Sequence, residues 1–175
     1  MIDFTNIEYL KAGNKKQKRA YEVLRKYKVF EKLKPYAPVL AGTIPIGIDI
    51  ESSDLDIICE VDLRFEEDFL DDIALGRLIP GDTDVKVENI IVHGEKSIVL
   101  NFMLDEFPIE IFGQNKPSTE QNAYRHMLAE YRILQEKGED FKHKIIELKN
   151  QGIKTEPAFG LLMGLENPYE DLLKF

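Results

Sequence analysis

Apolar positions recur at helical spacing near the start of the chain. Residues 15–27 carry one apolar face, which predicts an amphipathic helix, and the same stripe continues until Pro35 stops it. The residues of the stripe are Ala20, Val23, Leu24, Tyr27, Phe30 and Leu33. We expect this face to be buried against the rest of the fold.

The pattern then changes to short apolar runs that are rich in β-branched residues. Five of these runs, at residues 38–42, 54–61, 85–94, 96–104 and 107–113, predict β-strands. The segment His93-Gly94-Glu95-Lys96 suits a hairpin turn between the third and the fourth strand. Helical spacing at 64–78, with acidic residues in the first half, predicts a helix between the second and the third strand.

Helical spacing returns after residue 116. Ser118 and Gln121 have the spacing of a capping box, which predicts a helix that begins there and runs to Gly138. A second helix is predicted at 140–150, and a third from Thr155. The whole pattern predicts an α/β (α+β) fold. Residues 1–115 form a mixed β-sheet with flanking helices, and residues 116–175 form a helical region packed on it.

Composition and charge indicate in which compartment this protein lies and which partners it can bind. The chain of 175 residues is long enough for a domain with its own core, and no apolar run approaches the ~20 residues that a membrane span needs. The first 20 residues lack the apolar region of a secretory signal, and Cys59 is the single cysteine, so we expect a cytoplasmic protein. The net charge of −9 argues against general binding to nucleic acid, whose phosphates it repels.

Asp54 and Asp56 stand where an apolar strand begins. Because side chains alternate along a strand, the two carboxylates point to the same face, about 7 Å apart. Glu110 is a lone acid between Ile109 and Ile111 in another predicted strand, where a charge is seldom left without a partner. If the two strands are neighbours, the three carboxylates form one cluster.

Three carboxylates in one cluster repel one another, so protons or cations must accompany them. Mg²⁺ (or Mn²⁺) fits, because such an ion is held by one or two carboxylates together with the phosphates of a substrate. Two other interpretations stay open: Asp54 and Asp56 form an exposed acidic turn, or Glu110 is half of a buried ion pair. Asp49 and Glu51, in the preceding loop, are expected to be solvated rather than to bind a metal ion.

The stretch GTIPIGIDIESSDLDI resembles the signature of the nucleotidyltransferase superfamily, which has the polymerase-beta-like fold. The residues at matching positions are Gly42, Gly47, Ser53, Asp54, Asp56 and Ile57. The resemblance implies that Gly42 and Thr43, with Ser53 beside them, hold the phosphates of a nucleoside triphosphate. It also implies that Asp54 and Asp56 hold the metal ions and that a later carboxylate, here Glu110, completes the site.

One position departs from this pattern. Ile46 stands where many active members have Arg, so one cationic contact to phosphate is missing. Arg125, in the first C-terminal helix, is the candidate to supply this cationic contact to the phosphates of the bound nucleotide. His126 lies in one line along the same helix with Asn122 and Glu130, and a hydrogen bond on the helix surface explains this spacing without a site.

The stretches IEIFGQNKPSTEQNAYRHMLAEYRIL and GIKTEPAFGLLMGL also resemble a small bacterial family of unknown function within the superfamily. The function that follows is transfer of a nucleoside monophosphate from a nucleoside triphosphate to an acceptor hydroxyl. The expected partners are that triphosphate and an unknown acceptor, either a small molecule or a protein. Two alternatives on the same fold are a protein that binds a nucleotide without turnover and a module that binds a protein partner through its helical region.

Overall fold

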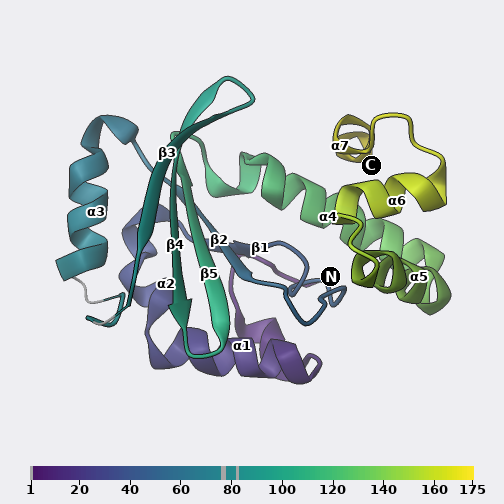
Figure 1. The fold of residues 1–175 in the computed structure, drawn as a ribbon, viewed down its shortest axis with the longest axis horizontal. Coiled ribbons are helices and arrows are strands. Elements are labelled where there is room, and N and C mark those ends of the chain that lie inside the picture. The colour runs from purple at the N-terminus through teal and green to yellow at the C-terminus, as the bar shows by residue number, and fades with distance from the viewer. Residues whose placement is uncertain (1, 76–77, 82) are drawn as a thin grey trace.

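A five-stranded β-sheet lies at the centre of the part of the chain that is described here (Figure 1). The computed structural model describes residues 2–75, 78–81 and 83–175. The strands lie in the order β1 (Val39–Ala41), β2 (Leu55–Glu60), β5 (Phe107–Gln114), β4 (Glu95–Leu104) and β3 (Lys86–Val92). β2 and β5 are parallel, and the other neighbours are antiparallel. The mixed sheet predicted from the sequence is confirmed.

Helices from the N-terminal half cover one face of this sheet (Figure 1). They are α1 (Lys15–Lys26), α2 (Val29–Lys32) and α3 (Glu66–Leu75). Their apolar side chains share one core with those of β2, β4 and β5 that point to this face, among them Leu24, Phe69, Ile57, Leu100 and Ile111. Of the helix predicted at 64–78, residues 76–77 lie outside the described residues.

The N-terminal apolar stripe is divided between two helices. Lys28 has a left-handed backbone with a φ of 54°, so α1 ends before it and α2 begins after it. Phe30 and Leu33 still pack on the same core, as the stripe predicts. The start of α1 is capped, because the Asn14 side chain accepts a hydrogen bond from the backbone N–H of Gln17 (2.8 Å) and the Gln17 side chain accepts one in return (2.8 Å).

The C-terminal helices pack on the other face of the sheet, beside β1 and β2. They are α4 (Asn122–Lys137), α5 (Glu139–Asn150), α6 (Thr155–Met163) and α7 (Pro168–Asp171). A second apolar core joins them to Val39, Ala41 and Ile58 of the sheet and to Ile46 and Ile48 of the β1–β2 loop. The predicted helical C-terminal region is therefore confirmed. Among the described helices, none combines the length and the apolar composition that a membrane crossing needs.

The capping box predicted at Ser118 is wrong. Ser118 begins a short 3₁₀ turn, and α4 starts only at Asn122, without a capping bond from the side chain of Gln121. The Ser118 hydroxyl donates instead to the carbonyl of Ala37 (2.6 Å), and Gln121 Nε2 donates to the carbonyl of Cys59 (2.8 Å). These tertiary acceptors outcompete the local backbone, and the two side chains consequently tie the C-terminal region to the sheet.

Candidate functional site

A cleft of about 540 Å³ lies between the sheet and the C-terminal helices. The β1–β2 loop, β2 and β5 line one side of it, and α4, α5, α6 and α7 line the other. Six of the seven predicted site residues line this cleft: Gly42, Thr43, Ser53, Asp54, Asp56 and Glu110. Residues from three separate segments of the chain thus meet at one place.

Gly42 turns the chain directly after β1. Its φ of 79° is left-handed, a conformation that residues with a side chain rarely adopt. A Cβ at this position would lie 2.0 Å from Oδ2 of Asp56, so the glycine also makes room for that carboxylate. Thr43 Oγ1 and Ser53 Oγ lie 3.3 Å apart, and Ser53 Oγ accepts a hydrogen bond from the backbone N–H of Ile50 (2.9 Å). These contacts link Ser53, near the end of the β1–β2 loop, to Thr43 at its start and to Ile50.

Asp56 and Glu110 are partners in the register of the parallel strands β2 and β5. Their side chains therefore share one face, on strands about 4.8 Å apart, and Asp54 lines the same cleft from just before β2. Burial raises the pKa of Asp56 to about 8, and the charges of Asp54 and Glu110 add to this rise while Lys149 opposes it. Burial and the charge of Asp54 also raise the pKa of Glu110.

The three carboxylates form no hydrogen bond or ion pair with any residue that the structure describes. The buried ion pair that was the alternative for Glu110 is therefore not found in this part of the chain. Oxygen ligands of this kind suit Mg²⁺ (or Mn²⁺). In residues 2–75, 78–81 and 83–175, however, no group of three or more His, Cys, Asp or Glu side chains is arranged to hold a metal ion. The acids fit an ion that takes its remaining ligands from a bound triphosphate and water.

Across the cleft, the C-terminal helices carry a second set of polar side chains, which we call the helical wall: His126, Glu130, Lys149, Glu156 and Tyr169. Lys149, on α5, is buried, and its ammonium group donates to the carbonyl of Ile48 (2.8 Å). Burial lowers the pKa of Lys149 to about 8. Glu130, on α4, is only 4 % exposed, and burial raises its pKa well above the ordinary value.

His126 takes part in this wall rather than in a bond on the helix surface, so that expectation is wrong. Its ring is buried, and Nε2 lies 2.7 Å from the carbonyl oxygen of Tyr169. Because a carbonyl can only accept, Nε2 carries the proton of this hydrogen bond. The other ring nitrogen, Nδ1, lies 3.7 Å from Oε1 of Glu156 on α6.

Two residues singled out in the sequence lie elsewhere. Arg125 is exposed and is not among the described residues that line the cleft. Ile46, at the position where many nucleotidyltransferases have Arg, is 6 % exposed and packs in the C-terminal core. The described cations of the cleft are Lys116, which pairs with Glu95 (2.9 Å), and Lys149. Lys149 is thus the cation of the cleft that has no carboxylate partner among the described residues.

Lys149 was not predicted as a site residue, and Glu130 was expected only in a hydrogen bond on the helix surface, although each leaves a signal in the sequence. Both occupy buried positions of a helical stripe, Glu130 four residues before Leu134 and Lys149 four residues after Ile145. A charged residue at an apolar position of a helix is the same signal that singled out Glu110 in its strand.

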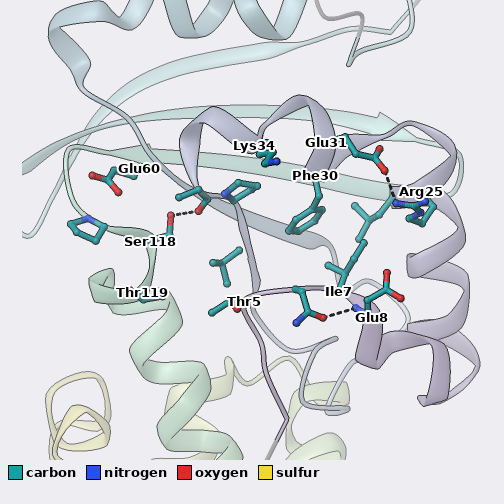
Figure 2. A pocket seen from close by; sticks show the side chains of 16 residues that line it. Thr5, Ile7, Glu8, Arg25, Phe30, Glu31, Lys34, Glu60, Ser118 and Thr119 are labelled. Carbon is teal, nitrogen blue, oxygen red and sulfur yellow. Dashed lines mark hydrogen bonds and ion pairs between the residues drawn. The ribbon is translucent and has the colours of Figure 1, made fainter.

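A second cavity, of about 520 Å³, lies at the opposite end of β1 (Figure 2). Val39, at the start of this strand, lines the cavity, whereas Gly42 follows the last residue of the strand. Phe30 contributes to the apolar lining, and an ion pair between Arg25 and Glu31 (2.5 Å) lies at its edge (Figure 2). None of the predicted site residues lines this cavity.

Several solved structures have a similar fold. One is the poly(U) polymerase Cid1, solved with Mg 3′-dATP bound, with a TM-score of 0.53 and 15 % identity over 78 % of this chain and 41 % of that chain. Others are a chain of the GLD-2/RNP-8 complex (TM-score 0.52, 14 % identity, 82 % and 55 % covered) and the polymerase core of TRAMP, an RNA surveillance complex (0.52, 9 %, 91 % and 49 %).

The chain thus spans 41–55 % of the length of these three chains, and at such identities the likeness concerns the fold alone. It confirms the nucleotidyltransferase fold that the motif around Asp54 and Asp56 predicts. A comparison with curated proteins finds no match. Residues 22–175 match the family described as a domain of unknown function, DUF4269, and the chain therefore belongs to this family.

Proposed function

We propose that this protein is a metal-dependent nucleotidyltransferase that moves a nucleoside monophosphate from a nucleoside triphosphate to an acceptor hydroxyl. The observation that carries the proposal is the close approach of the Gly42 turn to Asp56, on a strand that pairs in register with Glu110. Backbone N–H groups at such a turn suit phosphate oxygens, and carboxylates without protein cations suit Mg²⁺ that accompanies a triphosphate. The similar fold of Cid1, solved with Mg 3′-dATP bound, supports the same class of ligand.

The β1–β2 loop and the helical wall would bind the triphosphate from two sides. Gly42 and Thr43 offer backbone donors, and Thr43 and Ser53 offer hydroxyl groups. Lys149 would supply the cationic contact for which Arg125 was the candidate, because Lys149 lines the cleft and Arg125 does not. Its ammonium group has further N–H donors beside the one that bonds the Ile48 carbonyl.

In the transfer step, the acceptor oxygen attacks the α-phosphorus and forms a new P–O bond. The bond from that phosphorus to the oxygen that bridges to the β-phosphate breaks, and its electron pair leaves with pyrophosphate. Glu110 is the candidate to accept the hydroxyl proton, because a raised pKa makes its ionised carboxylate a stronger base. Asp54 and Asp56 would hold Mg²⁺ (or Mn²⁺), which when bound neutralises the charge of the phosphates.

Nucleotide binding without transfer is the second candidate function. One observation favours it: among the described residues no three-residue metal cluster is arranged in advance. In this case the protein binds a triphosphate in the cleft and releases it unchanged.

The test is a labelling assay. The protein is incubated with each of the four α-³²P-labelled triphosphates, Mg²⁺ or Mn²⁺ and a cell extract, and the label is followed into protein or small molecules. We expect transfer by the wild type and none by Asp56→Asn. Triphosphate binding without any transfer supports the second candidate, and a wild type that binds no triphosphate in calorimetry refutes both.

A further inference from the structure

Glu130, on α4, is a buried acid that lines the cleft. It is 4 % exposed, it lines the cleft, and it forms no hydrogen bond or ion pair with any residue in the described part of the chain. Leaving a buried carboxylate without a cation or a donor is costly. Because Glu130 lines the cleft, a ligand bound there can supply that partner.

His126 and Glu156 present two hydrogen-bond acceptors to the same point. In the neutral tautomer that matches the hydrogen bond from Nε2 of His126 to the Tyr169 carbonyl, Nδ1 carries a lone pair. This atom lies 3.7 Å from Oε1 of Glu156, too far for a direct hydrogen bond. An N–H group placed between them would bind both.

Positive charge is scarce in the cleft. Six carboxylates and two lysines are among the described residues that line it. Lys116 is paired with Glu95, which leaves Lys149 for the remaining acids. Metal ions that accompany a triphosphate would neutralise the side of the cleft around Asp54 and Asp56, whereas the helical wall has two acidic side chains, Glu130 and Glu156, and one lysine, Lys149.

We infer that the helical wall binds the acceptor of the transfer reaction, and that this acceptor is an amino alcohol whose protonated amine is held by Glu130 and Glu156. The inference rests on the proposed function. An ammonium group brings three N–H donors and a positive charge, which match the acceptors His126 Nδ1, Glu130 and Glu156. An acceptor that carries phosphates, such as an RNA end, is repelled by the same acids.

The experiment uses the full chain loaded with Mg²⁺ and α,β-methylene-ATP, whose α–β bridge cannot be cleaved. The probe is 1,3-diamino-2-propanol, and glycerol, which replaces both amines with hydroxyls, is its matched control. We expect the diamine to bind at least about tenfold more tightly in calorimetry, and Glu130→Gln and Glu156→Gln each to lose about tenfold, as the loss of one charge-assisted hydrogen bond predicts. Glu95→Gln removes a cleft carboxylate outside the helical wall and should bind the diamine as the wild type does.

Equal affinity for the diamine and glycerol overturns the inference, and so does an equal loss in Glu95→Gln, which points to the general charge of the cleft. If Glu130→Gln does not fold, Glu156→Gln decides, because the Glu156 side chain is 24 % exposed and tolerates an amide. If the analogue does not bind to the wild type, the proposed function fails. The diamine titration is then read without Mg²⁺ and the analogue, where the same variants still report on the helical wall.

Discussion

Replacing Asp56 with asparagine is expected to stabilise the metal-free protein, and the gain should grow with pH. The pKa of Asp56 is raised from an ordinary value of 3.8 to about 8. Between these values the folded protein holds a proton that the unfolded chain has released, so the free energy of unfolding falls as the pH rises. Below the ordinary value the carboxyl is protonated in both states, and this loss disappears. Asparagine does not ionise, so the variant does not lose free energy of unfolding in this way at any pH.

The size of the gain in free energy of unfolding follows from the difference between the two pKa values. Each pH unit between them costs the folded state about 1.4 kcal/mol, and pH 7 lies about three units above the ordinary value, which sets an upper limit of about 4 kcal/mol. Relaxation of a buried site and water penetration lower the effective cost of ionising a buried group below this limit. We therefore expect Asp56→Asn to gain about 1–4 kcal/mol at pH 7 and almost nothing at about pH 4.

The assay is urea unfolding in the presence of a chelator, at about pH 4, 6 and 8, of the wild type, Asp56→Asn and Asp71→Asn. Asp71 is an exposed residue of α3, and its substitution should change the free energy of unfolding by no more than about 0.5 kcal/mol. Glu110 and Glu130, whose pKa values are also raised, are present in all three proteins, and their own contributions largely cancel in the differences. With Mg²⁺ and ATP the order should reverse, because ligand binding stabilises the wild type more.

Two results would refute this reasoning. A variant that is less stable than the wild type at pH 7 would mean that Asp56 has a structural partner. A gain that does not change with pH would mean that Asp56 is ionised in the folded protein, and the picture of a buried, repelled carboxylate would be wrong.

Three further substitutions test the site and its surroundings. Gly42→Ala should lower the free energy of unfolding by about 1–3 kcal/mol and weaken binding of Mg²⁺ and ATP, because the new Cβ would lie 2.0 Å from Oδ2 of Asp56 at a φ of 79°. Unchanged affinity in calorimetry would mean that the phosphates bind elsewhere. Lys149→Met should weaken ATP binding by about tenfold through loss of a charged contact, and wild-type affinity would remove this lysine from the phosphate site. Gly160→Ala brings a Cβ to 2.3 Å from Cγ of Pro168 and should separate α6 from α7, with a loss of about 1–3 kcal/mol; hydrogen exchange of α7 as slow as in the wild type would contradict it.

The face on which each site residue lies could be predicted from the sequence. Asp54 and Asp56 share a face because the period of two in a strand is a property of the backbone itself. Glu110 could be singled out because an acid in an apolar strand needs a partner, and Gly42 because it matches the nucleotidyltransferase signature. These signals are local, and each depends on a few neighbouring residues.

Only the tertiary structure decided which of these faces meet. β2 pairs with β5 although β3 and β4 lie between them in the chain, and this pairing makes Asp56 and Glu110 neighbours. Glu130 and Lys149 reach the cleft only because the C-terminal helices pack on the β1–β2 loop, and Ser118 bonds Ala37 instead of capping its own helix for the same reason. Local backbone geometry determines to which face a side chain points. Which residues it then contacts depends on how the whole chain buries its apolar surface, and this cannot be read from any short stretch of sequence.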